Sequence, residues 1–191
     1  MLFDLIKRGL DIVVALALLI SLSWLLALVA VAVRLTSPGP ALYWSDRVGR
    51  NGRIFSMPKF RSMPVDTPAL ATHLMSAAEL RLTPIGSFLR RTSLDELPQL
   101  WSILRGDMSL VGPRPALFNQ HDLIELRQRY GVDALRPGVT GLAQVNGRDE
   151  LSIPEKVRFD AEYLRTRGLA TDARIVLQTV RKVLRGDGVQ H

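Results

Sequence analysis

Hydrophobic and polar positions divide the chain into one long apolar run and a series of shorter, patterned segments. The run from Ile12 to Val33 has 22 residues and no charge. As a helix it would be about 33 Å long, which is enough to cross a hydrocarbon core of about 30 Å. We therefore predict a membrane-inserted helix, because the run is also too long for the apolar part of a signal peptide.

The charges beside this run bear on its path through the membrane. Lys7 and Arg8 precede it, and Arg34 follows it with further arginines. Basic flanks stay on the cytoplasmic side, so both ends are expected there. A helix that enters one leaflet, bends and returns satisfies this expectation, and a simple transmembrane span is the alternative.

Beyond Thr36 the pattern changes to short alternating segments. Residues 41–45 and 53–57 are predicted strands, and the loop between them contains Asn51 and Gly52, which favour a tight turn. The result is a small β-hairpin with Arg47 and Arg50 at its tip. Those arginines fit substrate contact and a solvated turn equally well.

Helical spacing returns after the adjacent acids Asp95 and Glu96. Ser93 and Glu96 have the spacing of a capping box, which is a purely structural interpretation. Arginines precede the pair, and Arg114 lies between two prolines downstream, so a phosphate-binding site is the other interpretation. In such a site a carboxylate can attack phosphorus or hold Mg²⁺.

The remaining segments predict further helices and complete the fold class. An amphipathic helix is expected over 116–130, another follows Ser152, and a cationic amphipathic helix follows Asp172. The last one suits either the membrane interface or the domain core. The fold class is therefore α+β and mainly helical, with a membrane-inserted helix, a small hairpin and interfacial amphipathic helices.

Composition narrows the function classes. The 191 residues suit one domain, the formal charge of +7 favours polyanionic partners, and the lack of cysteine excludes disulfides and thiolate metal sites. Nucleic acid is not an expected partner, because the chain has neither an aromatic-basic platform nor a recognition-helix motif and carries a membrane segment.

Three motifs carry a family resemblance that runs from about Ile6 to Val189. SLDELPQLWSILRGDMSLVGPRP, with KFRSM upstream and RPGVTGLAQVNGR downstream, resembles the bacterial sugar transferases called monotopic phosphoglycosyl transferases. The resemblance implies a re-entrant membrane anchor over 1–36 and a catalytic domain over 37–191 on the cytoplasmic face of the bacterial inner membrane.

The implied reaction moves a sugar-1-phosphate from a UDP-sugar to a polyprenol (undecaprenyl) phosphate and releases UMP. It would be the first membrane step of surface polysaccharide or glycoconjugate biosynthesis. The rival class is a non-catalytic, membrane-anchored basic module that binds anionic lipid or an assembly partner. Neither the sugar nor the oligomeric state is indicated by any residue pattern.

The resemblance also implies roles for individual residues. Asp95 would form a covalent phosphosugar-aspartyl intermediate, and Glu96 would assist it, both as ligands of Mg²⁺. Four basic residues would bind substrate phosphate: Lys59, Arg61, Arg90 and Arg114. Three residues would hold nucleotide or sugar: Arg136, Gln144 and Arg148. The membrane helix would bend at Ser23 and Trp24, where relatives typically have a Ser-Pro pair.

Overall fold

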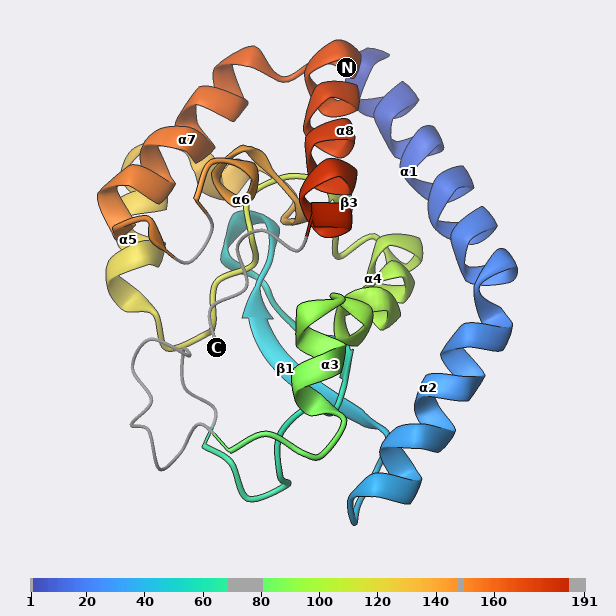
Figure 1. The fold of residues 1–191 in the computed structure, drawn as a ribbon. Coiled ribbons are helices and arrows are strands. Elements are labelled where there is room, and N and C mark those ends of the chain that lie inside the picture. The colour runs from blue at the N-terminus through green and yellow to red at the C-terminus, as the bar shows by residue number, and fades with distance from the viewer. Residues whose placement is uncertain (1, 69–80, 148–149, 186–191) are drawn as a thin grey trace.

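The computed structural model describes residues 2–68, 81–147 and 150–185, which form a mainly helical molecule (Figure 1). The elements in chain order are α1 (Leu2–Ser21), α2 (Ser23–Thr36), β1 (Leu42–Val48), η1 (Arg50–Gly52), β2 (Ile54–Phe60), α3 (Gly86–Arg91), η3 (Leu94–Gln99), α4 (Leu100–Arg105), β3 (Ser109–Val111), α5 (His121–Arg129), η4 (Val132–Ala134), β4 (Gly138–Thr140), α6 (Leu142–Val145), α7 (Ile153–Thr166) and α8 (Leu169–Arg185).

The N-terminal apolar run is a bent pair of helices. Leu22 separates α1 from α2, and the two are bent by 62°. The Ser23 hydroxyl donates to the Ile20 carbonyl at 2.9 Å beside the bend, as expected for a hydroxyl that competes with the helical ladder. Among the described residues, no single helix is long and apolar enough to cross a membrane, but this pair is by length and composition.

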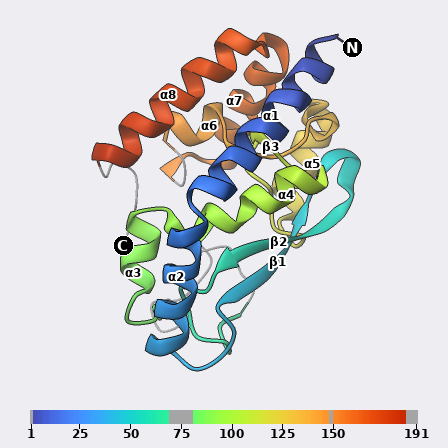
Figure 2. The same cartoon turned by 90° about the vertical axis from the view of Figure 1, so that its right-hand side faces the viewer.

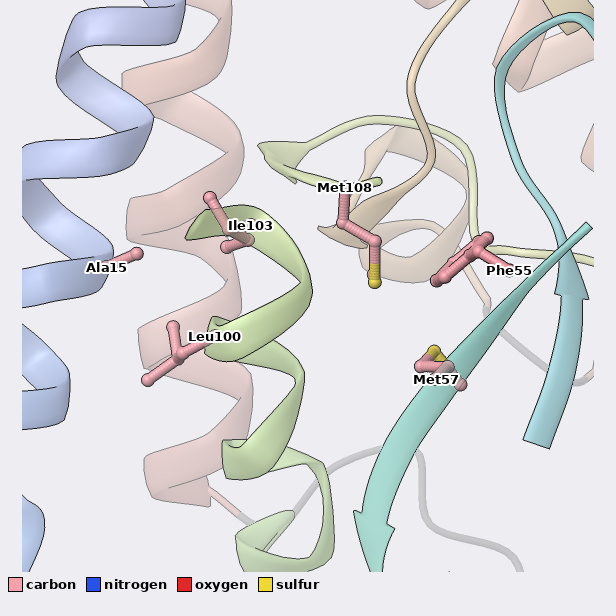
Figure 3. Close-up of a cluster of buried hydrophobic side chains, with 6 residues drawn as sticks. All are labelled: Ala15, Phe55, Met57, Leu100, Ile103 and Met108. Atoms are coloured by element: carbon pink, nitrogen blue, oxygen red, sulfur yellow. The ribbon is translucent and has the colours of Figure 1, made fainter. Parts of the chain in front are cut away.

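The bent pair covers one side of the molecule (Figure 2). α1 packs on α4, and Lys7 of α1 forms a 2.6 Å ion pair with Asp172 of α8. Ala15 is fully buried against Leu100 and Ile103 of α4. Figure 3 shows this cluster continuing through Met108 to Phe55 and Met57 of β2, so the first helix and the hairpin share one core.

The predicted β-hairpin is present and longer than its pattern indicated. β1 and β2 pair antiparallel from Leu42 opposite Phe60 to Val48 opposite Ile54. The turn contains Asn51 and Gly52, both with positive φ, as this dipeptide favours. Because β1 extends to Val48, Arg47 lies within the strand and not at the tip.

A second sheet was not predicted. β3 and β4 pair in parallel through Ser109–Gly138 and Val111–Thr140. The backbones approach so closely that a Cβ on Gly138 would lie 2.1 Å from the Gly112 nitrogen. Glycine is therefore required there, and the β3–β4 pair fixes the turn that follows Val111.

The last two helices pack back onto this second sheet. α7 is the helix predicted to follow Ser152, and it begins with a capping box in which Ser152 and Glu155 bond each other's backbone groups. Ile175 of α8 is buried in the core, whereas Val176, Val180 and Val183 stay exposed. α8 thus uses one face for packing and leaves an apolar face outward.

Candidate active site

The two adjacent carboxylates lie in η3, at the entrance to α4. Ser93 precedes them with φ 56°, a left-handed conformation that is uncommon for a residue with a side chain. No side-chain cap hydrogen bond forms there, so the predicted capping box between Ser93 and Glu96 is wrong. The Ser93 backbone turns the chain so that the Glu96 carboxylate points to cationic partners instead.

Glu96 is fixed by two cations from distant parts of the chain. Its Oε1 accepts from Lys59 Nζ of β2 at 3.0 Å and from Arg114 Nη2, which follows β3, at 2.8 Å. Burial lowers the pKa of Lys59, and the Glu96 charge opposes that shift. Two charge-assisted hydrogen bonds to one oxygen thus hold this carboxylate in one orientation.

Asp95 has a different environment. It is 7% exposed, and its carboxylate accepts no hydrogen bond and makes no salt bridge among the described residues. Burial raises its pKa, while Lys59 opposes the shift most strongly, followed by Arg90 and Arg114, and Glu96 adds to it. Asp95 is therefore partly desolvated and surrounded by cations, but no hydrogen bond among the described residues fixes its oxygens.

Arg90 and Arg61 have separate roles in the structure. The positive charge of Arg90 opposes the rise in the pKa of Asp95. The Arg90 Nε donates to Ser62 Oγ at 3.1 Å. Arg61 is 4% exposed and donates to the carbonyls of Pro40 and Ser37 at 2.8 and 2.9 Å. Its guanidinium therefore joins the end of β2 to the segment after α2, and lies outside the contacts made by the carboxylate pair.

Arg136 and Gln144, two of the three residues predicted to hold nucleotide or sugar, donate to backbone carbonyls and not to the carboxylate pair. Arg136 donates to the Gly106 carbonyl at the far end of α4, where burial and the charges of Arg8 and Arg50 lower its pKa. Gln144 donates weakly to the Val139 carbonyl at 3.3 Å. Arg148 lies outside the described residues.

Arg47 is the site residue for which sequence reasoning left the role open. Its Nε donates to Ser45 Oγ at 2.9 Å, and its Nη1 donates to the Pro115 carbonyl at 3.2 Å. Burial, and next the charge of Arg114, lower its pKa to about 10. The alternation of Ser45 and Arg47 along β1 was the available signal, because both side chains lie on one face of that strand.

Comparison with known proteins identifies the family. A family model described as bacterial sugar transferase matches residues 2–186, which include every element described above. The chain belongs to the bacterial sugar transferase family. This match spans both the bent N-terminal helices and the carboxylate pair, so both are parts of one family domain.

Curated relatives of this bacterial sugar transferase carry informative names. It is 42% identical over 185 residues to the UDP-glucose:undecaprenyl-phosphate glucose-1-phosphate transferase of Escherichia coli, covering 93% of this chain and 40% of that protein. It is 37% identical over 203 residues to the undecaprenyl-phosphate galactose phosphotransferase of Salmonella typhimurium, covering 96% and 41%. It is 37% identical over 189 residues to the exopolysaccharide production protein ExoY of Sinorhizobium fredii, covering 91% and 83%.

The chain spans about two fifths of the length of the first two relatives and most of the third. The residues that match the family model include the carboxylate pair and the cations around it. Four basic side chains surround the two acids of this bacterial sugar transferase: Lys59, Arg90, Arg114 and Arg47. The resulting excess of positive charge suits a ligand with several negative oxygens, such as a diphosphate.

Proposed function

We propose that this protein transfers a sugar-1-phosphate from a UDP-sugar to a polyprenol phosphate and releases UMP. The observation that carries the proposal is the unequal pair of carboxylates: Glu96 is bound by Lys59 and Arg114, whereas Asp95 is desolvated but unbound. Two neighbouring acids in different environments can take two different roles in one reaction. The names of the relatives support the donor and acceptor classes.

In the first step, an oxygen of Asp95 attacks the sugar-bearing phosphorus. A new P–O bond forms to the aspartyl oxygen, and the P–O bond to the UMP phosphate breaks, so that UMP leaves with the bonding electron pair. In the second step, an oxygen of the polyprenol phosphate attacks the same phosphorus and expels the Asp95 carboxylate. The product is a polyprenol diphosphate sugar, and the enzyme returns to its starting form.

Arg90, Lys59 and Arg114 neutralise the charge that develops on the transferring phosphoryl group. Glu96 orients Lys59 and Arg114 through the hydrogen bonds to its Oε1. Exclusion of water by the buried setting of Asp95 protects the aspartyl phosphate from hydrolysis. A two-step exchange lets a water-soluble donor and a membrane acceptor use one site in turn.

The donor set fits Mg²⁺, which protein sites often hold through one or two carboxylates together with substrate phosphates. The described residues contain no group of three or more metal-ligating side chains, and Glu96 Oε1 is taken by two cations. In this proposal Asp95 and Glu96 are the protein ligands of Mg²⁺, and the donor diphosphate supplies the remaining oxygen ligands. Mg²⁺ would neutralise the diphosphate and favour departure of UMP.

The bent helix pair is proposed as a re-entrant membrane anchor with both ends on the cytoplasmic face. The support is the 62° bend, the basic residues at both ends and the exposed apolar side chains along the pair. The outward apolar face of α8 is proposed to lie at the same membrane interface. This arrangement places the carboxylate pair near the surface from which a polyprenol phosphate presents its headgroup.

The test is UMP release from a panel of UDP-sugars by purified protein in detergent, with Mg²⁺ and undecaprenyl phosphate. We expect one donor to be used, and Asp95→Asn to lower kcat by at least about 10³-fold, because the nucleophile is lost. Asp46→Asn, an exposed carboxylate on β1, is the matched control and should keep wild-type turnover. Folded wild-type protein that releases no UMP from any donor would contradict the proposal, and appreciable turnover by Asp95→Asn would contradict the role of Asp95.

A further inference from the structure

The turn that carries Arg114 is buried and conformationally restricted on both sides of that residue. Residues 111–117 are buried except for Arg114 itself. Pro113 and Pro115 on either side have no backbone N–H and a fixed φ, so the turn has few conformations available. Arg114 is thus the one side chain of this turn that reaches the carboxylate pair.

Four successive backbone carbonyls of this turn each accept a hydrogen bond from elsewhere. The Pro113 carbonyl accepts from the Gly138 N–H of β4 at 2.9 Å, and the Ala116 carbonyl accepts from the Val48 N–H of β1 at 2.9 Å. The two carbonyls between them accept from side chains: Arg114 from Arg127 Nη1 at 2.8 Å, and Pro115 from Arg47 Nη1 at 3.2 Å. The turn therefore has two arginine contacts in addition to two backbone contacts.

The Arg127 guanidinium is itself fixed by Asp160. Its Nε and Nη2 donate to Asp160 Oδ2 of α7 at 2.9 and 2.7 Å; the Asp160 side chain is buried and that of Arg127 is 11% exposed. This fork leaves Nη1 directed at the Arg114 carbonyl. A buried ion pair adds little net stability compared with well-packed apolar residues, so stability alone gives a weak reason for it.

We infer that Arg127, oriented by Asp160, is a positioning residue that holds the Arg114 guanidinium on Glu96. The inference rests on the proposed function, because Arg114 acts there on the donor diphosphate. The connected path runs from Asp160 through Arg127 to the Arg114 carbonyl, and from the Arg114 side chain to Glu96 Oε1. Loss of Arg127 would leave the turn folded by its backbone contacts but would allow the Arg114 side chain to move.

The experiment replaces the ion pair by apolar residues, Arg127→Met with Asp160→Leu, so that no buried charge is left unpaired. We expect thermal unfolding close to that of wild type and kcat/KM for UMP release lower by about 10- to 100-fold, because a displaced phosphate ligand loses its alignment. Arg129→Met is the matched control: it lies on the same helix with its side chain 73% exposed and should leave kcat/KM unchanged.

A double-mutant cycle separates positioning from a merely structural role. Arg114→Ala is measured alone and together with the pair replacement. If Arg127 acts through Arg114, the combined variant should lie within about threefold of Arg114→Ala alone. Losses that multiply in the combined variant, or full turnover by the folded pair replacement, would overturn the inference.

A second variant covers the case in which the pair replacement does not fold. Arg127→Lys keeps the charge opposite Asp160 but lacks the planar fork that reaches the carboxylate and the carbonyl together. It should fold and still lose kcat/KM, and wild-type kcat/KM in Arg127→Lys would count against the inference. Absence of UMP release by wild type, in contrast, would remove the proposed function itself.

Discussion

At the scale of single residues, Asp95 and Glu96 are adjacent in sequence yet differ in almost every physical respect. Glu96 shares one oxygen between Lys59 and Arg114, which fixes its direction. Asp95 is buried beside the same cations without a direct hydrogen bond among the described residues. The cations therefore bind one carboxylate directly and act on the other through their charge alone.

The pH dependence of turnover should report the Asp95 environment. Burial raises the Asp95 pKa, so the reactive carboxylate is present at high pH and is lost as pH falls through that raised value. The acid limb of kcat/KM should therefore lie above the ordinary range of an aspartate. Lys59→Met removes the cation that opposes the shift most strongly and should move the limb to higher pH, whereas Lys59→Arg should keep it near wild type. An acid limb unchanged in Lys59→Met would show that Asp95 is not the group that titrates.

Turnover should depend on Mg²⁺, and Glu96 should contribute to that dependence. EDTA is expected to abolish UMP release, and Mg²⁺ is expected to restore it. Glu96→Gln should lower kcat by about 10²-fold and raise the Mg²⁺ concentration that gives half-maximal rate, because a ligand and the partner of two cations are lost together. Glu125→Gln, on an exposed part of α5, is the control. EDTA-resistant turnover would exclude the magnesium proposal.

At the scale of elements, α1 directly contacts α4, the helix that follows the carboxylate pair. Arg8 donates to the carbonyls of Ile103 and Leu104 at 2.7 and 3.2 Å, at the C-terminal end of α4. Ala15 packs on the side of the same helix. A cation at a helix C-terminus satisfies carbonyls that otherwise lack partners. The bent helix pair and the η3–α4 segment are therefore parts of one packed unit.

Enlargement of Ala15 should disturb this packing. Ala15→Leu inserts three carbon atoms where the side chain is fully buried, and we expect a loss of about 1–3 kcal/mol in unfolding free energy. Val13→Leu, on the outward face and 64% exposed, is the matched control and should change stability by less than about 0.5 kcal/mol. Thermal unfolding in detergent measures both. Equal stability of Ala15→Leu and wild type would mean that α1 does not pack on α4.

The elements that sequence reasoning found are those set by local patterns. The hairpin turn at Asn51 and the start of α7 after Ser152 both follow from residues within a few positions. The parallel β3–β4 pair joins residues far apart in sequence. Each strand has only three residues, which is too short for an alternating pattern to predict it. The resemblance implies that Arg61 binds substrate phosphate, whereas its contacts with the carbonyls of Pro40 and Ser37 depend on the folded chain and follow from no local pattern.

At the scale of the whole molecule, the outer surface of the bent pair is apolar over most of its length. Large exposed side chains lie along both helices, among them Leu5, Val13, Trp24, Leu28 and Val31. A contiguous apolar surface of this kind is rare on a protein that water surrounds on all sides. The surface therefore supports insertion of α1 and α2 into lipid, with the core cluster around Ala15 on the opposite face.

Membrane topology can be measured directly because the chain has no native cysteine. Single variants Leu2→Cys, Trp24→Cys and Arg53→Cys place a thiol at the start of the pair, at the bend and beyond the pair. With a membrane-impermeant maleimide, a re-entrant anchor predicts labelling of positions 2 and 53 only in inside-out vesicles, and labelling of position 24 in neither orientation. Detergent should expose all three as the control. A span would place position 2 on the face opposite position 53, so labelling of Leu2→Cys in right-side-out vesicles would contradict the re-entrant anchor.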